Sequence, residues 1–314
     1  MSDLPPSSRT PQSTGQVGVL MALTAFGWWA GVTPLYFHVL DSIPASEQLA
    51  WRVVSGLPAM LVILFLGRQL PKLRAILRSP RVLLWLVCSG ALLSINWFTF
   101  TWAVINQRLV EGSLGYYINP LVSVLLGAIF LGERLRGLQL VAVVIAAIGV
   151  AVNTVALGHL PWISLVLAFT FGFYGLIRKQ IHAAPGPGVT VEMLLMLPVM
   201  VVVLAIAYQT PEGIPHTSWS WTLLLLAGPQ TVVPLLFYTG AARRITLSTL
   251  GLLQFLAPTG QLLLAVLAFG ESFTTGQLLA FALIWSAVII YSVDTWRRSR
   301  VRERSDARSV PSVD

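Results

Sequence analysis

One residue carries a fixed positive charge inside an apolar stretch of this sequence. Arg52 lies five residues into the apolar segment 47–67, where a guanidinium costs about 2.5–3.5 kcal/mol on insertion scales unless it meets water or a partner. Arg52 must therefore face the protein interior. Two uses are open, because it could bind an anionic group of a small molecule or form a salt bridge with Glu47, little more than one helical turn away.

Aromatic and amide side chains gather in other apolar segments. Amides and hydroxyls surrounded by lipid must be satisfied, so they turn inward and either join helices or meet a substrate. Trp28 could stack on an aromatic ligand, although tryptophan in a membrane protein more often packs or anchors. The candidate cavity residues are Arg52, Asn96, Trp97, Tyr116, Tyr117, Asn119, Gln254, Phe255 and Trp28.

Two carboxylates could couple proton binding to transport, and two prolines could act as hinges or gates. Glu111 opens an apolar segment, where the helix dipole favours a carboxylate; if it faces a cavity instead, burial would disfavour its charged form and suit proton coupling. Glu47 is the second coupling candidate. Pro120 and Pro258 lie inside apolar segments and each free a backbone carbonyl, so they could form gates or static kinks.

The sequence contains no motif typical of the enzymes considered. It has no His-Glu-x-x-His zinc pattern, no Gly-x-Ser-x-Gly elbow and no phosphate-binding loop. The single cysteine, Cys88, excludes an intramolecular disulfide and a cysteine-rich metal site. We therefore expect no catalytic residue, cofactor or resident metal.

The composition predicts a membrane protein. Hydrophobic residues make up 56% of the chain and charged residues 10%, against roughly 45–50% and about 25% in a soluble domain. Apolar runs of about 20 residues, long enough to cross a bilayer, follow one another and do not alternate, which predicts helices and not a barrel. The ten predicted spans are 17–39, 47–67, 82–105, 110–131, 138–157, 160–178, 190–208, 219–240, 245–269 and 275–296.

Basic residues predict the orientation of these spans. All of the 20 Lys and Arg residues except Arg52 and Arg108 fall at the chain ends or in alternate connections, and such segments stay in the cytoplasm. Both termini are therefore predicted to be cytoplasmic, with residues 1–16 and 297–314 as disordered tails, the second one basic. This distribution also accounts for the net charge of +8, so we expect no nucleic-acid partner.

An internal repeat divides the chain. A shift of 138 residues superposes the later spans of the two halves, and a shift of 145 superposes their beginnings. Each half, 17–157 and 158–296, has five spans, an odd number, so the second half is inverted and an alternating-access mechanism is expected. The matched positions include Gly90 with Gly228, Tyr116 with Gln254, Tyr117 with Phe255, Pro120 with Pro258, Glu133 with Glu271, and Glu47 with Glu192.

Two stretches carry a family resemblance. EGSLGYYINPL at 111–121 with LGER at 131–134, and LSTLG at 247–251 with Gln254, Phe255 and Pro258, resemble the RarD-type permeases of the EamA family in the drug/metabolite transporter superfamily. The resemblance, which extends from about Gly18 to Trp296, implies an all-α fold of ten helices in two inverted five-helix repeats and location in a bacterial inner membrane. It also implies a permease role associated by name with chloramphenicol. Phe255 departs from the tyrosine expected there.

These features predict a secondary-active carrier that transports small metabolites or drugs across the bilayer, driven by protons or by a counter-transported solute. An amphipathic carboxylate such as an amino acid and a neutral drug such as chloramphenicol both fit the candidate cavity. A channel and a non-transporting scaffold or sensor remain alternatives, the first less favoured because a continuous polar lining is missing. The expected assembly is a monomer or a weak homodimer.

Overall fold

The computed structural model describes residues 11–308 except 133–136, 182, 210–216, 243, 246–249 and 251–252. The repeat residue Glu133 and the family motif at 247–249 and 251 therefore lie outside the described residues. The described elements are helices: α1 (Pro11–Gly27), η1 (Trp28–Val32), α2 (Thr33–Val39), α3 (Ala45–Leu66), α4 (Leu70–Leu77), α5 (Pro80–Ile105), α6 (Leu109–Leu131), α7 (Gly137–Leu157), α8 (Trp162–Gln180), α9 (Pro185–Ala207), α10 (Ser218–Ala242), α12 (Leu256–Leu267) and α13 (Thr275–Arg308).

Eight of the described helical segments are long and apolar enough to cross a membrane, with α1, η1 and α2 counted as one segment. Two shorter apolar helices, Trp162–Arg178 and Leu256–Leu267, lie at the predicted spans 160–178 and 245–269. Many large apolar side chains on the span helices are exposed, among them Leu66 at 73% and Val155 at 83%. In a soluble protein they would be a liability, whereas in a bilayer they face lipid.

The predicted span 245–269 is not one continuous helix in the described residues. A turn at Gln254 and Phe255 precedes α12, and Pro258 lies in the first turn of that helix. Proline is tolerated there because the first N–H groups of a helix have no intrahelical partner. Pro258 therefore marks a helix beginning, while Pro120 lies inside the continuous helix α6.

The two predicted tails are partly helical. Helix α1 begins at Pro11, inside the first predicted tail, and α13 continues through Arg308, so the described backbone is helical at 11–16 and 297–308, while the disorder of the tails stays a prediction. Extending an existing helix requires no new nucleation, and arginine, glutamate and alanine are good helix formers. The first span also contains the π-helical turn η1, a form that is rare and often occurs at functional sites.

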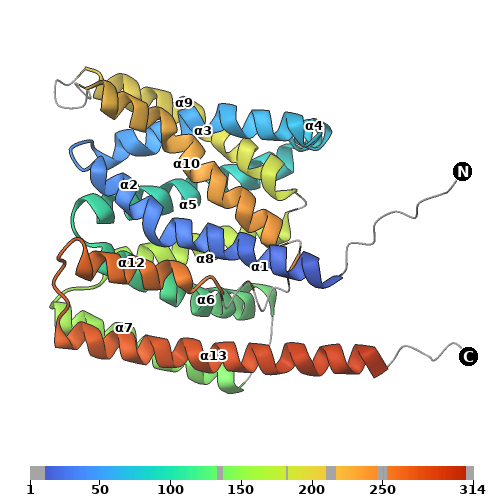
Figure 1. The fold of residues 1–314 in the computed structure, drawn as a ribbon, viewed down its shortest axis with the longest axis vertical. Helices are drawn as coiled ribbons and strands as arrows, with labels where there is room; N and C mark the ends of the chain where they lie inside the picture. Colours follow the sequence, from blue (N-terminus) through green and yellow to red (C-terminus); the bar gives the residue numbers. More distant parts are fainter. Residues whose placement is uncertain are drawn as a thin grey trace, which may run out of the picture.

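The helices run side by side between two ends of the bundle (Figure 1). Helix α1 begins and α13 ends at the right of Figure 1, where α4 also lies, and we call this the terminal end. The connections at 40–44, 106–108, 158–161 and 268–274 lie at the left, and we call this the distal end. Helices α7 and α13 form a layer of their own along the bottom of the view and are each other's principal neighbour.

Helix contacts occur in pairs related by the repeat. The contact of α5 with α8 corresponds to that of α10 with α1. In the same way, the contact of α3 with α10 corresponds to that of α9 with α5, and the contact of α6 with α8 corresponds to that of α12 with η1. Each of these contacts joins a helix of the first half to a helix of the second. The halves are therefore interleaved and do not form separate domains.

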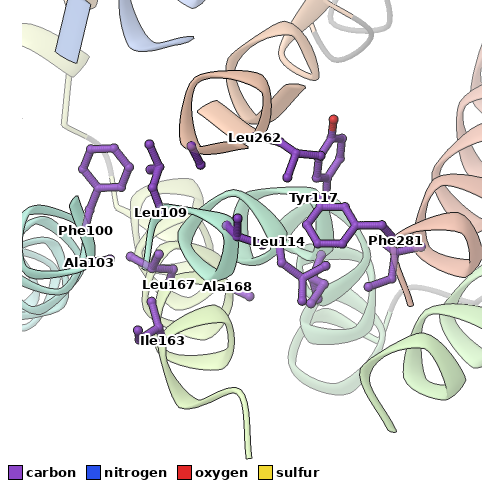
Figure 2. Close-up of a cluster of buried hydrophobic side chains, with 14 of the residues drawn as sticks. Phe100, Ala103, Leu109, Leu114, Tyr117, Ile163, Leu167, Ala168, Leu262 and Phe281 are labelled. Carbon is purple, nitrogen blue, oxygen red and sulfur yellow. The ribbon is translucent and has the colours of Figure 1, made fainter. Parts of the chain in front are cut away.

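Close packing holds the bundle together, because lipid provides no hydrophobic drive for helices to associate. The largest described buried cluster joins α5, α6, α8, α12 and α13, and Figure 2 shows Leu114, Leu167 and Phe281 among its members. Small residues bring backbones close elsewhere. A Cβ added to Gly115 would lie 2.7 Å from the carbonyl oxygen of Ser164, so α6 and α8 touch where only glycine fits.

Candidate functional site

Arg52 is buried near the distal end of α3, with 5% of its surface exposed. Its guanidinium carbon lies 4.9 Å from the ring centre of Phe37 on α2 and 4.4 Å from that of Trp97 on α5. Both distances are within cation–π range. The predicted cavity residues Arg52 and Trp97 are thus brought together, and Phe37 completes the cluster around the charge.

Neutral hydroxyls supply the hydrogen-bond partners of Arg52. Nε donates to Thr231 Oγ1 on α10 at 3.1 Å, and one terminal N–H group donates to Thr101 Oγ1 on α5 at a long 3.5 Å. No described carboxylate lies within ion-pair distance of this guanidinium. A group with five N–H donors is therefore buried without an opposite charge in the described part of the chain.

The salt bridge between Arg52 and Glu47, one of the two uses left open for Arg52, is not among the ion pairs of the described residues. Both oxygens of the Glu47 carboxylate are buried without a hydrogen-bond partner, and the residue is fully buried. The physical reason is helical spacing, because residues five apart point in directions about 140° apart, whereas neighbours on one face are three or four apart. Glu47 as a coupling residue stays a prediction.

Two tyrosines lie beside the residues that surround Arg52. The Tyr36 ring packs edge-on against Phe37, with ring centres 5.3 Å apart. Tyr116 donates to Asn96 Oδ1 at 3.3 Å, and Tyr36 donates to the carbonyl of Leu223. We use the name Arg52 cluster for Arg52 with Tyr36, Phe37, Asn96, Trp97, Thr101, Tyr116 and Thr231.

Asn96 ties this cluster to the second half of the chain. Its amide nitrogen donates to the carbonyl of Leu167 and to Thr170 Oγ1, each at 3.0 Å. Both acceptors are on α8. The amide is buried at 1% exposure, so it joins helices in the present arrangement and presents its oxygen to Tyr116.

The repeat-related residues Tyr117 and Phe255 face each other. Their rings stack with centres 6.2 Å apart and planes 13° apart. The Tyr117 hydroxyl also shares a 2.5 Å hydrogen bond with Thr259 Oγ1 on α12. Phe255 thus contributes a ring without a hydroxyl at the point where equivalent positions of the two halves meet.

Five predicted cavity residues are not joined to the Arg52 cluster by any described hydrogen bond or ring contact: Tyr117 and Phe255, which contact each other, and Asn119, Trp28 and Gln254. Asn119 accepts from Ser123 on its own helix at 3.3 Å. The indole nitrogen of Trp28 is buried without a hydrogen-bond partner. Gln254 lies in the turn before α12. Their contact with a substrate stays a prediction.

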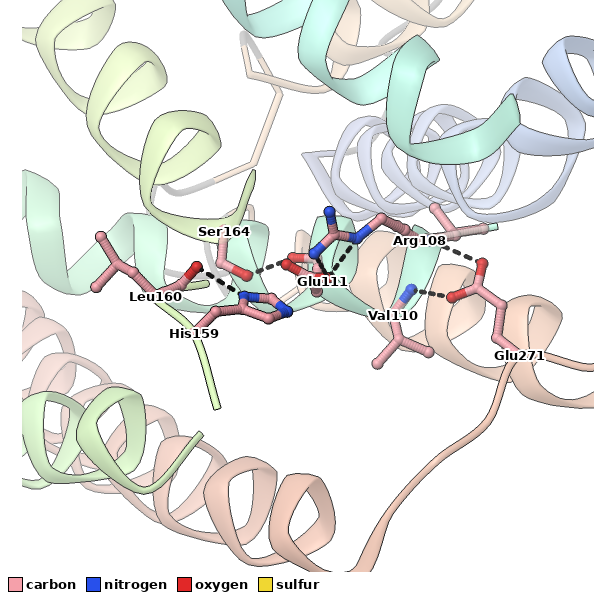
Figure 3. A network of polar contacts seen from close by, with 8 residues as sticks. Arg108, Val110, Glu111, His159, Leu160, Ser164 and Glu271 are labelled. Carbon is pink, nitrogen blue, oxygen red and sulfur yellow. Dashed lines mark hydrogen bonds and ion pairs between the residues drawn. The ribbon is translucent and has the colours of Figure 1, made fainter. Parts of the chain in front are cut away.

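A polar network lies at the distal end, and Figure 3 shows its contacts. Glu271, from the connection before α13, accepts hydrogen bonds from the backbone N–H groups of Leu109 at 2.7 Å and Val110 at 2.8 Å. It therefore caps the first turn of α6, a helix of the other half, at the position where a carboxylate also suits the helix dipole. The helix that Glu271 caps is thus distant from it in sequence.

Glu111 is paired with arginine in the same network. Arg108 Nε donates to Glu111 Oε1 at 2.7 Å, and a second nitrogen of the guanidinium lies 2.5 Å from that oxygen. The backbone carbonyl of Glu111 also accepts from Ser164 Oγ at 2.7 Å. This geometry favours a structural role over proton coupling, which stays a prediction for Glu111.

Burial raises the pKa of the Glu271 carboxyl above its usual range, against the opposing effect of the two backbone N–H groups that it accepts from. The charge of Glu111 raises this pKa further and Arg108 lowers it. Ionised Glu271 is therefore less favourable in the folded protein than in water, even though its cap geometry is good.

A second buried charged group lies near the terminal end. Glu192 on α9 is fully buried and lies 3.5 Å from a terminal nitrogen of Arg178 on α8. It accepts hydrogen bonds from Ser89 Oγ at 2.5 Å and from the Tyr174 hydroxyl at 3.4 Å. None of these residues was predicted to form a site, because Arg178 belongs to the basic residues that predict orientation and Glu192 was matched only as the counterpart of Glu47.

The position of Glu192 in the sequence nevertheless indicates a buried charged group. A carboxylate inside an apolar segment is as costly as Arg52, so the reasoning that selected Arg52 applies to it. The other missed residues, Tyr36, Phe37, Thr101 and Thr231, carry no charge and occur in segments rich in similar residues. Among the residues searched, no group of three or more His, Cys, Asp or Glu side chains could hold a metal ion.

Comparison with known proteins gives two matches to one family model, described as the EamA-like transporter family, at residues 16–155 and 160–293. An uncharacterized transporter of Pseudomonas aeruginosa is 45% identical over 289 residues, covering 90% of this chain and 95% of that protein. Protein RarD of Escherichia coli strain K12 is 43% identical over 279 residues, covering 88% and 94%.

A more distant relative of Pseudomonas aeruginosa, named chloramphenicol-sensitive protein RarD, is 31% identical and covers 91% of this chain and 97% of that protein. A solved crystal structure superposes with a TM-score of 0.57 at 21% identity, covering 88% of this chain and 96% of that one. This last likeness concerns the fold alone.

Proposed function

Because this chain belongs to the EamA-like transporter family, a family of membrane transporters, we propose that it is a secondary-active carrier working by alternating access around the Arg52 cluster. Ten spans cross the bacterial inner membrane, with the terminal end in the cytoplasm and the distal end outside. Export is the proposed direction. The substrate is a small amphipathic molecule that bears a carboxylate or a similar anionic group.

The observation that carries this proposal is the environment of Arg52. A buried guanidinium is costly in a membrane protein, and its described hydrogen bonds reach only two neutral threonine hydroxyls. An anionic ligand would supply the missing opposite charge, and arginine binds carboxylates in a two-point geometry. The rings of Phe37 and Trp97 would contact the apolar part of the same ligand.

Alternating access is supported by the interleaving of the halves. The Arg52 cluster draws residues from α2, α3, α5 and α6 of the first half and from α10 of the second. Inverted repeats can exchange conformations around a site of this kind, because the two halves are alike and face opposite ways. The stacked pair Tyr117 and Phe255 joins the two halves, so this contact would have to adapt when the halves exchange conformations.

The test is counterflow in proteoliposomes with two labelled probes, phenylalanine as an amphipathic carboxylate and chloramphenicol as a neutral drug. Wild-type protein should show saturable uptake that an excess of the same unlabelled compound on the other side accelerates. Removing a hydrogen bond to a charged group costs about 1.5–3 kcal/mol, so Arg52→Gln should weaken apparent affinity for the carboxylate by about tenfold to hundredfold.

Matched variants separate loss of binding from loss of folding. Arg74→Gln, on the exposed surface of α4, should transport like wild type, and both variants should unfold at similar temperatures in detergent. Unsaturable flux would support a channel, and absence of flux for both probes would support a scaffold or sensor. Normal carboxylate affinity in a folded Arg52→Gln carrier would remove Arg52 from the substrate site.

A further inference from the structure

Glu192 lies inside the bundle and not at its surface. It is the eighth residue of α9, which begins at Pro185, so it lies about 10 Å along the helix from the terminal end. Its side chain is fully buried. A carboxylate at this depth is stable only with hydrogen bonds, with an opposite charge, or in its protonated form.

The hydrogen-bond partners of Glu192 are hydroxyls. Ser89 Oγ on α5 is 2.5 Å from one carboxylate oxygen, and the Tyr174 hydroxyl on α8 is 3.4 Å from the other. A hydroxyl can donate to an ionised carboxylate and can rotate to accept from a protonated one. This set of partners therefore tolerates both protonation states of Glu192.

The other carboxylates near helix ends have partners of a different kind. Glu271 accepts from two backbone N–H groups and Glu111 from the guanidinium of Arg108, and such groups can only donate. Both sets of partners favour the ionised form alone. Glu47 is buried with no described partner for either oxygen. Of these four side chains, Glu192 alone has partners that suit a change of protonation.

Arg178 provides a charge that is close but weakly attached. Its nearest nitrogen is 3.5 Å from Glu192 Oε1 and forms no hydrogen bond in the described structure. A second nitrogen donates to the carbonyl of Pro185 at 3.4 Å. The guanidinium occupies the space above Gly188, where an added Cβ would lie 2.0 Å from it. Arg178 thus stays near Glu192 because residue 188 has no side chain.

We propose that Glu192 is the proton-binding site of this carrier. In the step concerned, the Glu192 carboxylate takes one proton from water at the terminal end and becomes a neutral carboxylic acid, while Arg178 keeps its own protons and no other bond changes. The charged or titratable groups that act on Glu192 are Arg178 and Tyr174 on α8; Tyr238 of α10 acts on Tyr174 in turn. Among the described residues, α3, α4 and α5 bring no further charge to it.

This site can link protonation to movement of the two halves. Ser89 belongs to the first half, whereas Tyr174, Arg178 and Glu192 belong to the second. Helices α5 and α9 pack closely there, since a Cβ added to Gly90 would lie 3.6 Å from that of Glu192. Separating α5 from α9 would remove the Ser89 hydroxyl from the carboxylate. The coupling role rests on the proposed carrier function, whereas proton binding itself does not.

Proton binding is tested without a substrate. The purified full-length protein in detergent is treated with a hydrophobic carbodiimide, which reacts with protonated buried carboxyls, over a series of pH values, and the modified peptides are measured by mass spectrometry. Glu192 should be labelled at low pH and lose labelling as the pH rises. Gly188→Ala, which displaces the flexible end of Arg178, and Arg178→Gln should both retain labelling at higher pH than wild type. Glu192→Gln removes the label at this position.

Coupling is tested in proteoliposomes with labelled phenylalanine as the probe. An imposed pH gradient should raise accumulation in wild type, and Glu192→Gln should reduce this gradient-driven accumulation at least tenfold, while Asp41→Asn, which changes an exposed carboxylate, should keep it. Labelling of Glu192 that is absent or independent of pH would overturn the proposal, as would accumulation driven by sodium alone or abolished only by Glu47→Gln. If Glu192 titrates while even wild type transports neither probe, the proton site stands and the carrier function fails.

Discussion

Gly228 lies where α10 and α3 touch backbone to backbone, and replacing it with alanine should damage the bundle. An added Cβ would lie 2.0 Å from the backbone nitrogen of Gly56 and 2.3 Å from its Cα. The Gly228 N–H group also donates to Ser55 Oγ at 2.8 Å. Because the obstructing atoms are backbone and not the end of a flexible side chain, the two helices must move apart.

The expected loss follows from this geometry. Ordinary Cβ contacts are 3.4–4 Å long, so the helices must separate by about 1 Å or more, in an interior packed as densely as a crystal. Overpacking of this kind costs about 1–3 kcal/mol, and loss of the Ser55 hydrogen bond about 0.5–1.5 kcal/mol. The higher helix propensity of alanine returns up to about 1 kcal/mol. Gly228→Ala should therefore lower the free energy of unfolding by about 2–3 kcal/mol.

The repeat supplies a matched control. Gly90 is the counterpart of Gly228 at the 138-residue offset, but a Cβ added there would meet Met196 at 3.5 Å and Glu192 at 3.6 Å, which are ordinary contacts. Gly90→Ala should be neutral or stabilising by up to about 1 kcal/mol. Reversible unfolding in mixed micelles, followed by circular dichroism, measures both variants. Values within about 0.5 kcal/mol of each other would refute the reasoning.

Three further outcomes are expected. Burial raises the pKa of Glu271, so the folded state binds the proton of this carboxyl more tightly than the unfolded state does. The stability gained from this proton is fully present below the usual glutamate pKa of about 4.3 and is lost as the pH rises through the raised pKa. The difference in free energy of unfolding between wild type and Glu271→Gln should change with pH in this way. Tyr117→Phe should lose about 0.5–1.5 kcal/mol with its bond to Thr259 but keep the stack on Phe255, measured by unfolding. Asn96→Ala should lose about 1–3 kcal/mol, because its two bonds to α8 disappear, and an unchanged unfolding curve would contradict that role.

Much of the architecture could be predicted, because a membrane restricts what a sequence can do. Lipid requires long apolar helices, so the spans follow from hydropathy. The repeat then predicts which positions of the two halves are equivalent. The stacking of Tyr117 on Phe255 agrees with the 138-residue offset. Arg52 and Trp97 were each predicted to line the interior, since a charge inside lipid must be buried among protein groups, but the contact between them was not predicted.

Details that depend on the exact direction of a side chain could not be predicted in this way. Glu47 is near Arg52 in sequence but points elsewhere, and Arg178 approaches Glu192 only because Gly188 leaves room for it. The turn before α12 was not predicted, because the single polar residue Gln254 beside Phe255 does not interrupt an otherwise apolar segment. Hydropathy reports whether a segment prefers lipid and not which neighbour its polar atoms reach.

The pairing of α7 with α13 has a consequence for biosynthesis. Helix α7 emerges near the middle of translation, but its principal neighbour is the last helix to be made. Its small-residue face, which includes Ala142, Ala146 and Gly149, packs against Ile284 and Ala287 of α13. Until the ribosome has released those residues, this face has Leu121 of α6 beside it but lacks α13. A nascent chain that stops before Thr275 therefore leaves this surface of α7 without its principal partner.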